Sequence, residues 1–144
     1  MSITYYLVNG CWYLLSWLPL CVLYLFSDCI YYLLYYCIRY RRKVVRKNLV
    51  NSFPKKSLKE IIAIEKGFYA WFCDYVVETI KLRTMSAEEL QKRMVFEGLD
   101  KIQEAVDDGH SCVLYMGHLF NWEFVTSLSL YFNREDLVVG DILI

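Results

Sequence analysis

Charge is almost absent from the first 38 residues, where Asp28 is the one ionised side chain. Residues 39–59 lack acids and contain nine Lys or Arg, whereas residues 60–144 contain 15 acids and seven bases. The net charge of zero is therefore made up of −1, +9 and −8. Because nucleic-acid-binding proteins usually carry a basic surplus, the balance argues against that class. The pattern predicts a hydrophobic membrane anchor over 1–38, a basic juxtamembrane collar over 39–59 and a folded domain over 60–144.

Metal-binding and leader motifs are also missing. The six cysteines form no CxxC pair and no Cys/His spacing typical of a zinc site. We therefore expect no metal and no cofactor. The apolar start of the chain is too long for a cleaved signal peptide, lacks a positive beginning and is followed by no A-x-A-like site. We interpret it as a permanent anchor.

The anchor is long enough to cross a bilayer, since about 20 apolar residues suffice. Pro19 lacks an N–H and should break the helix, which predicts a short helix over Tyr5–Trp17 and a longer one over Pro19–Ile38. Tyr and Trp are abundant here, and both favour the headgroup level of a membrane. We expect a true span; a helix lying in the interface and a very apolar core helix are the alternatives.

The basic collar follows the anchor directly. Basic residues beside a span stay on the cytoplasmic side, and they attract anionic headgroups by about 1 kcal/mol per charge near the surface. A solvated helix face is the plainer interpretation of some of these charges. We expect the remaining chain to lie in the cytoplasm. The residues predicted to contact lipid headgroups are Arg39, Arg41, Arg42, Lys43, Arg46 and Lys47.

Beyond the collar, a capping box at Ser57–Glu60 predicts the start of a long helix. Its apolar positions, from Ile61 to Ile80, recur at helical spacing, and Glu65 and Asp74 fall off that stripe. Further helices are expected from Ser86, over Leu99–Val106 up to a left-handed cap at Gly109, and from about Asn121. Strands are expected at Met94–Phe96, at Cys112–Met116 and from Val138–Val139. This alternation predicts an α/β fold.

The stretch from Gly117 to Glu123 carries the chemical candidates. It follows an expected buried strand and leads into a helix, and in open α/β sheets sites gather at the carboxyl ends of strands. Glu123 can fold back to fix the tautomer of His118, whose other nitrogen then acts as a general base. Gly117 allows close approach of a substrate. Taken alone, a structural histidine or a helix-capping carboxylate is the more common explanation of such a pair.

Three places resemble the N-terminal half of the lipid A biosynthesis (Kdo2-lipid A lauroyl/myristoyl) acyltransferase family. Residues Arg46–Pro54 are similar to the family's R-x-N-L-x-x-x-F-P element, and Glu78 matches a recurring glutamate. Residues Glu97–Gly98 and Gly109–Glu123 are similar to its G-x-x-x-x-x-x-H-x-G-N-W-E neighbourhood, although eight residues rather than six lie between Gly109 and His118. Phe120 stands where a glycine is frequent, and Asn121–Glu123 is intact.

The resemblance implies acyl transfer in lipid A, and hence lipopolysaccharide, biosynthesis at the bacterial inner membrane. The donor would be an acyl thioester, usually acyl carrier protein, and the acceptor a hydroxyl of a lipid A precursor. His118 would deprotonate this hydroxyl and Glu123 would orient His118, while Gly117, Asn121 and Trp122 would contact the substrate. The implied fold is the first part of an acyltransferase-type α/β domain, and no covalent nucleophile is needed.

Family members run to roughly twice this length, so we expect 144 residues alone to have little or no activity. One alternative is a glycerolipid (lysophosphatidate-type) acyltransferase with a similar His-x4-acid motif. That class usually has Asp as the acid and Asn before the histidine, so Gly117, His118 and Glu123 favour the lipid A family over it. The other alternative is a non-catalytic, membrane-anchored interaction module.

Overall fold

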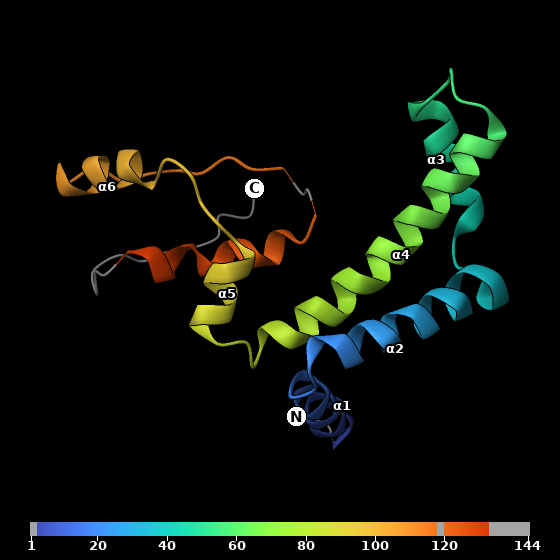
Figure 1. Ribbon diagram of the computed structural model, residues 1–144, viewed down its shortest axis with the longest axis horizontal. Helices are drawn as coiled ribbons and strands as arrows, with labels where there is room; N and C mark the ends of the chain where they lie inside the picture. The colour runs from blue at the N-terminus through green and yellow to red at the C-terminus, as the bar shows by residue number, and fades with distance from the viewer. Residues whose placement is uncertain (1–2, 118–119, 133–144) are drawn as a thin grey trace. The chain divides into compact units, whose positions relative to one another are not determined.

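The computed structural model describes residues 3–117 and 120–132, and the chain divides into two compact units. The N-terminal unit is Met1–Thr84 and the C-terminal unit is Met85–Ile144. The N-terminal unit contains α1 (Ile3–Ser16), α2 (Leu20–Tyr32), the π-helix η1 (Leu33–Ile38), α3 (Arg42–Ser52) and α4 (Leu58–Leu82) (Figure 1).

The predicted break at Pro19 is confirmed. α1 ends at Ser16, and α2 begins at Leu20 with Pro19 as its extended N-cap (φ −59°, ψ 146°). Because Pro lacks the N–H that a continuing helix needs, the chain restarts there rather than forming one long helix. The segment Leu20–Ile38 is 19 residues long and apolar enough to cross a membrane, and 17% of it is buried within the protein.

α4 begins at the predicted capping box. The Ser57 backbone N–H donates to Glu60 Oε2 (2.8 Å), and the Glu60 N–H donates to Ser57 Oγ (3.4 Å). These two bonds satisfy donors that the first helical turn leaves open. The helix then runs 25 residues, and α2 packs along it (Figure 1).

The buried line of α4 differs from the predicted apolar stripe. The buried side chains recur every four residues and belong to Ile61, Glu65, Tyr69, Cys73 and Val77, whereas Phe68 is 38% exposed. Glu65, which the sequence pattern assigned to the solvent side, is fully buried. The helical period was correct, but the contacting face includes a carboxylate.

The C-terminal unit contains α5 (Ala87–Arg93), α6 (Leu99–Asp107) and the 3₁₀-helix η2 (Trp122–Tyr131). Ser86 caps α5 by accepting the Glu89 N–H (3.2 Å), and Gly109 ends α6 with φ +79°, both as predicted. η2 packs on α5 through Tyr131, whose hydroxyl donates to the Met94 carbonyl oxygen (2.6 Å).

The predicted α/β fold is wrong for the part of the chain that the structure describes, which contains helices and no strand. Met94–Phe96 and Cys112–Met116 lack helical structure and have no strand partner among the described residues. Val138–Val139 lies outside the described residues. An apolar run becomes a strand only when its backbone pairs with another, and here Tyr115 is 89% exposed. Apolar composition alone does not supply that partner.

Candidate functional site

Of the predicted catalytic pair, Glu123 is placed and His118 lies outside the described residues. Glu123 is in the first turn of η2, directly after Asn121 and Trp122. The Thr126 hydroxyl donates to the Glu123 carbonyl oxygen (2.8 Å), which closes this turn. Gly117, at which we predicted close approach of the substrate, is exposed. It is the last described residue before positions 118 and 119.

The helix that carries Glu123 is fixed by its own buried face. Phe124, Ser127 and Leu128 are buried, and Gln91 Nε2 on α5 donates to the Leu130 carbonyl oxygen (3.2 Å). The ring of Tyr131 also meets Phe96 edge-on, with 5.3 Å between the ring centroids. Glu123 therefore lies on a helix that is held in place by packing on α5. A functional acid needs such a fixed support.

Phe120 adopts a left-handed backbone conformation, with φ 52°, and is 80% exposed. A side chain with a Cβ costs about 1–2 kcal/mol in this region, whereas glycine enters it freely. The position is the one at which the resembling family frequently has glycine. Phe120 therefore carries backbone strain that a glycine at this position would not have.

The basic collar is organised around a buried carboxylate. Glu65 accepts hydrogen bonds from Arg46 Nε (2.7 Å) and another Arg46 guanidinium nitrogen (2.8 Å), from Arg42 Nε (3.2 Å) and from the Tyr35 hydroxyl (3.0 Å). Burial raises the pKa of Glu65, but the Arg46, Tyr35 and Arg42 donors outweigh it, so the pKa lies below its ordinary value. The hydrogen bonds to Glu65 likewise raise the pKa of Arg46.

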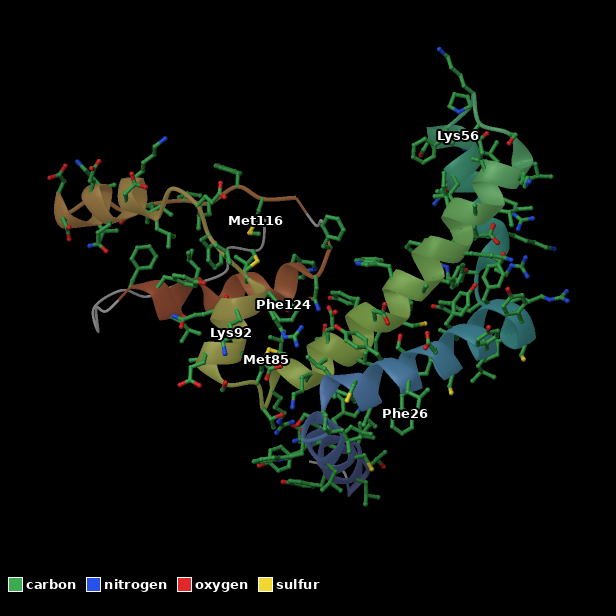
Figure 2. All side chains as sticks on the ribbon, viewed as in Figure 1. Phe26, Lys56, Met85, Lys92, Met116 and Phe124 are labelled. Atoms are coloured by element: carbon green, nitrogen blue, oxygen red, sulfur yellow. The ribbon has the colours of Figure 1, made fainter. Side chains whose placement is uncertain are left out.

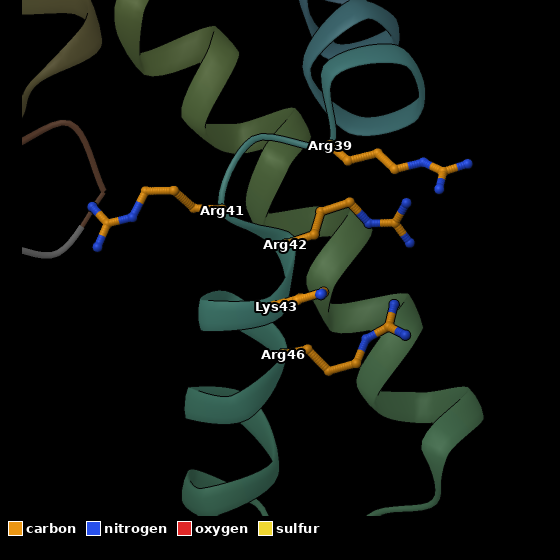
Figure 3. A pocket seen from close by; sticks show the side chains of 5 residues that line it. All are labelled: Arg39, Arg41, Arg42, Lys43 and Arg46. Atoms are coloured by element: carbon orange, nitrogen blue, oxygen red, sulfur yellow. The ribbon is translucent and has the colours of Figure 1, made fainter.

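This cluster divides the collar cations into two kinds. Arg42 and Arg46 are ion-paired with Glu65. Among the residues that the structure describes, no acid lies within ion-pair distance of Arg39, Arg41 or Lys43. These five residues line a shallow pocket of about 390 Å³, in which Arg41 extends away from the side that Arg39, Arg42 and Arg46 occupy (Figure 3).

Arg39 and Arg41 form the turn between η1 and α3, and both are left-handed, with φ 57° and 49°. The Tyr69 hydroxyl donates to the Tyr40 carbonyl oxygen between them, which ties the turn to α4. Sequence reasoning did not find this turn, because it contains no glycine, asparagine or proline. Strained arginines at the end of an apolar segment are consistent with a role for their charge.

Polar contacts continue along α2 and α4. The Tyr24 hydroxyl donates to Glu78 Oε1 (2.7 Å), and Ser27 Oγ donates to Asp74 Oδ1 (2.6 Å). Glu78, which matches a recurring glutamate of the resembling family, therefore binds the predicted anchor.

Sequence reasoning did not find the pairing of Glu65 with Arg42 and Arg46. The feature of the sequence that could have indicated this pairing is the i,i+4 spacing of the two arginines, which places them on one face of α3.

The described residues contain no group of three or more His, Cys, Asp or Glu side chains that could hold a metal ion. No side chain in this part of the chain is assigned to a cofactor.

A comparison with protein families identifies the class. The family model described as bacterial lipid A biosynthesis acyltransferase matches residues 1–130, which include the anchor, the collar, Glu78 and Glu123. The chain belongs to this family. No curated protein matches the chain, and no solved structure matches it.

Proposed function

We propose that the protein transfers a fatty acyl chain from an acyl thioester to a hydroxyl of a lipid A precursor. The match to the lipid A acyltransferase family over residues 1–130 carries this proposal. Acyl carrier protein is the proposed donor, and the reaction takes place at the cytoplasmic face of the bacterial inner membrane. Membership of this family favours a lipid A precursor over a glycerolipid acceptor.

In this mechanism, a ring nitrogen of His118 takes the proton of the acceptor hydroxyl as its oxygen attacks the thioester carbonyl. The carbon–sulfur bond breaks when the tetrahedral intermediate collapses, and the departing thiolate takes the proton from His118. Glu123 accepts the other ring N–H, which fixes the tautomer and stabilises the imidazolium. Support for this role is the position of Glu123 in the first turn of a helix held on α5.

Gly117, Asn121 and Trp122 contact the substrate beside this pair. They flank His118 and Glu123 in sequence, and Asn121 and Trp122 begin η2 with Glu123. In the collar, Arg39, Arg41, Lys43 and Lys47 bind anionic headgroups. Arg42 and Arg46 support that surface by fixing α3 to Glu65. The reaction needs neither a metal nor another cofactor.

The proposal is tested with membranes that contain the protein, labelled acyl–acyl carrier protein and a lipid A precursor. His118→Ala and Glu123→Gln should each lower label transfer by at least about 100-fold, the usual contribution of general-base catalysis. The matched controls are His110→Ala and Glu104→Gln, which change an exposed histidine and an exposed acid of the same unit. Unchanged transfer in both site variants would refute the role of His118 and Glu123, and no transfer by the wild-type protein would favour the non-catalytic membrane module.

Two further arms sharpen this assay. Lysophosphatidate is offered in competition with the lipid A precursor, and preferential labelling of lysophosphatidate would move the protein to the glycerolipid class. The assay is also run on residues 1–144 and on the product of the whole reading frame in which they occur. We expect the larger turnover from the latter, and the site variants are compared in whichever form turns over.

A further inference from the structure

Both ends of α4 are tied to the predicted anchor. At its start, Glu65 binds Tyr35 of η1, near the collar. At its end, Lys81 Nζ donates to the Ser16 carbonyl oxygen (3.0 Å), and the Thr84 hydroxyl donates to the same oxygen. α4 therefore runs antiparallel to α2 and η1 and returns to the level at which α1 ends (Figure 1).

This connectivity restricts how the anchor can meet a membrane. If Leu20–Ile38 crossed the bilayer with the collar inside, the end of α4 beside Ser16 would lie at the outer surface. The chain continues from Thr84 into Met85, so the unit that carries Glu123 would begin on the side opposite to the collar. The proposed function needs the collar and Glu123 on the same side, and the inference rests on the proposed function at this step.

The contact between α2 and α4 is also unsuited to a hydrocarbon interior. Asp74 and Glu78 bind α2 at Ser27 and Tyr24, two turns or more from the Glu65 cluster. A spanning α2 would place the carboxylates of Asp74 and Glu78 at membrane depth. Ionisable side chains are costly and rare in a hydrocarbon interior. Among the described residues, α4 is not one of the helices that are long and apolar enough to cross a membrane.

The face of α1 and α2 away from α4 is apolar and exposed. Phe26 projects from α2 on the side away from α4 (Figure 2). Many further aromatic and aliphatic side chains of α1, α2 and η1 are exposed, and such side chains are typical of helices that lie in the interface plane. They are Tyr5, Tyr6, Leu7, Trp12, Leu14, Trp17, Leu25, Tyr32, Leu33 and Tyr36.

Charge complementarity identifies the occupant of this face. The apolar segment ends at Ile38, and the next residues include Arg39, Arg41 and Lys43, for which no acid among the described residues lies within ion-pair distance. Anionic lipid headgroups supply the missing partners, and acyl chains cover the apolar face. We infer that α1, α2 and η1 lie in the plane of the cytoplasmic leaflet and do not cross the membrane.

Cysteine labelling in spheroplasts tests this topology. The five exposed cysteines are replaced by serine; Cys73 stays, because it is buried and burial raises the pKa of its thiol. Single cysteines are then introduced as Ser2→Cys, Trp17→Cys and Lys55→Cys. An impermeant maleimide should label none of them from outside, and it should label Ser2→Cys and Lys55→Cys once the membrane is opened.

Labelling of Trp17→Cys from outside, with Lys55→Cys protected, would establish a span or a membrane hairpin and overturn the inference. Outside labelling of Lys55→Cys would overturn it as well, because the collar would then lie on the wrong side. These outcomes are independent of acyl transfer, so an inactive protein with the expected labelling would refute only the proposed function.

Vesicle binding tests whether the exposed face meets lipid at all. The full chain should sediment with phosphatidylglycerol-containing vesicles, and Phe26→Glu should lower its partition coefficient by at least about tenfold. The matched control is Val95→Glu, which places the same charge at an exposed valine of the C-terminal unit. Circular dichroism confirms folding, and Leu25→Glu repeats the test one residue away. Wild-type protein left in the supernatant, or equal binding by Phe26→Glu, would overturn the inference.

Discussion

The fully buried carboxylate of Glu65 receives two hydrogen bonds from the Arg46 guanidinium, at 2.7 and 2.8 Å. The pair joins α3, which belongs to the basic collar, to the buried line of α4 near the start of that helix. Two parallel bonds fix orientation as well as distance, because the planar guanidinium matches a carboxylate. The collar therefore has a defined position on α4, and its other cations are presented from a fixed turn.

Removing the buried acid should destabilise the N-terminal unit. Glu65→Gln leaves two arginines facing a neutral group, and breaking a buried pair in this way costs about 3 kcal/mol. Urea unfolding followed by helical circular dichroism measures the loss. Glu104→Gln, at an exposed site on α6, should change the free energy of unfolding by less than about 0.5 kcal/mol. Equal losses in the two variants would show that the buried cluster adds nothing.

The same carboxylate predicts a dependence on pH. The pKa of Glu65 is lower in the folded protein than in the unfolded chain, so its ionised form stabilises the fold above the unfolded pKa of about 4.3. This contribution disappears as the pH falls through the folded value. Thermal unfolding between pH 3 and 7 should show the loss at the acid end, and Glu65→Gln should flatten it. An unchanged acid slope in the variant would contradict this assignment.

Arginine and lysine should not be interchangeable at position 46. Arg46→Lys keeps the charge but removes one of the two parallel hydrogen bonds, at an expected cost of about 1 kcal/mol. Lys47→Arg is the matched reverse exchange at the exposed neighbouring position, and it should be close to neutral. Urea unfolding compares them. A neutral Arg46→Lys would indicate that charge alone holds the cluster.

Relieving the backbone strain at Phe120 should stabilise the protein, whereas the preceding substitutions destabilise it. Phe120→Gly should make the segment before η2 more stable than Phe120→Ala does, by about 1 kcal/mol, since only glycine lacks the Cβ that disfavours φ 52°. Hydrogen exchange of the backbone amides in η2 is the measurement. If glycine and alanine protect η2 equally, the left-handed conformation stores no strain.

Local chemistry was the predictable part of this fold. The break at Pro19 and the cap at Ser57 were correct because each depends on a few neighbouring residues. The helical period of α4 was also correct, but period alone does not identify the contacting face. Glu65 became a core residue because Arg46 and Tyr35, distant in sequence, supply its hydrogen bonds.

The strands were not predictable from the same kind of signal. The apolar run at Cys112–Met116 does not specify the segment with which its backbone would pair, and a strand exists only through such pairing. At the candidate site, the motif around Glu123 was found by resemblance, and its place on η2 follows from packing against α5. The turn at Arg39 and Arg41 carried no glycine or asparagine that could have indicated it.

The role of His118 as the general base is the central claim, and one comparison tests it most directly. Transfer of a labelled acyl chain from acyl carrier protein to a lipid A precursor is measured for His118→Ala and for His110→Ala in the same membranes. The account predicts a loss of at least about 100-fold for His118→Ala and wild-type transfer for His110→Ala. Wild-type transfer by His118→Ala would contradict it.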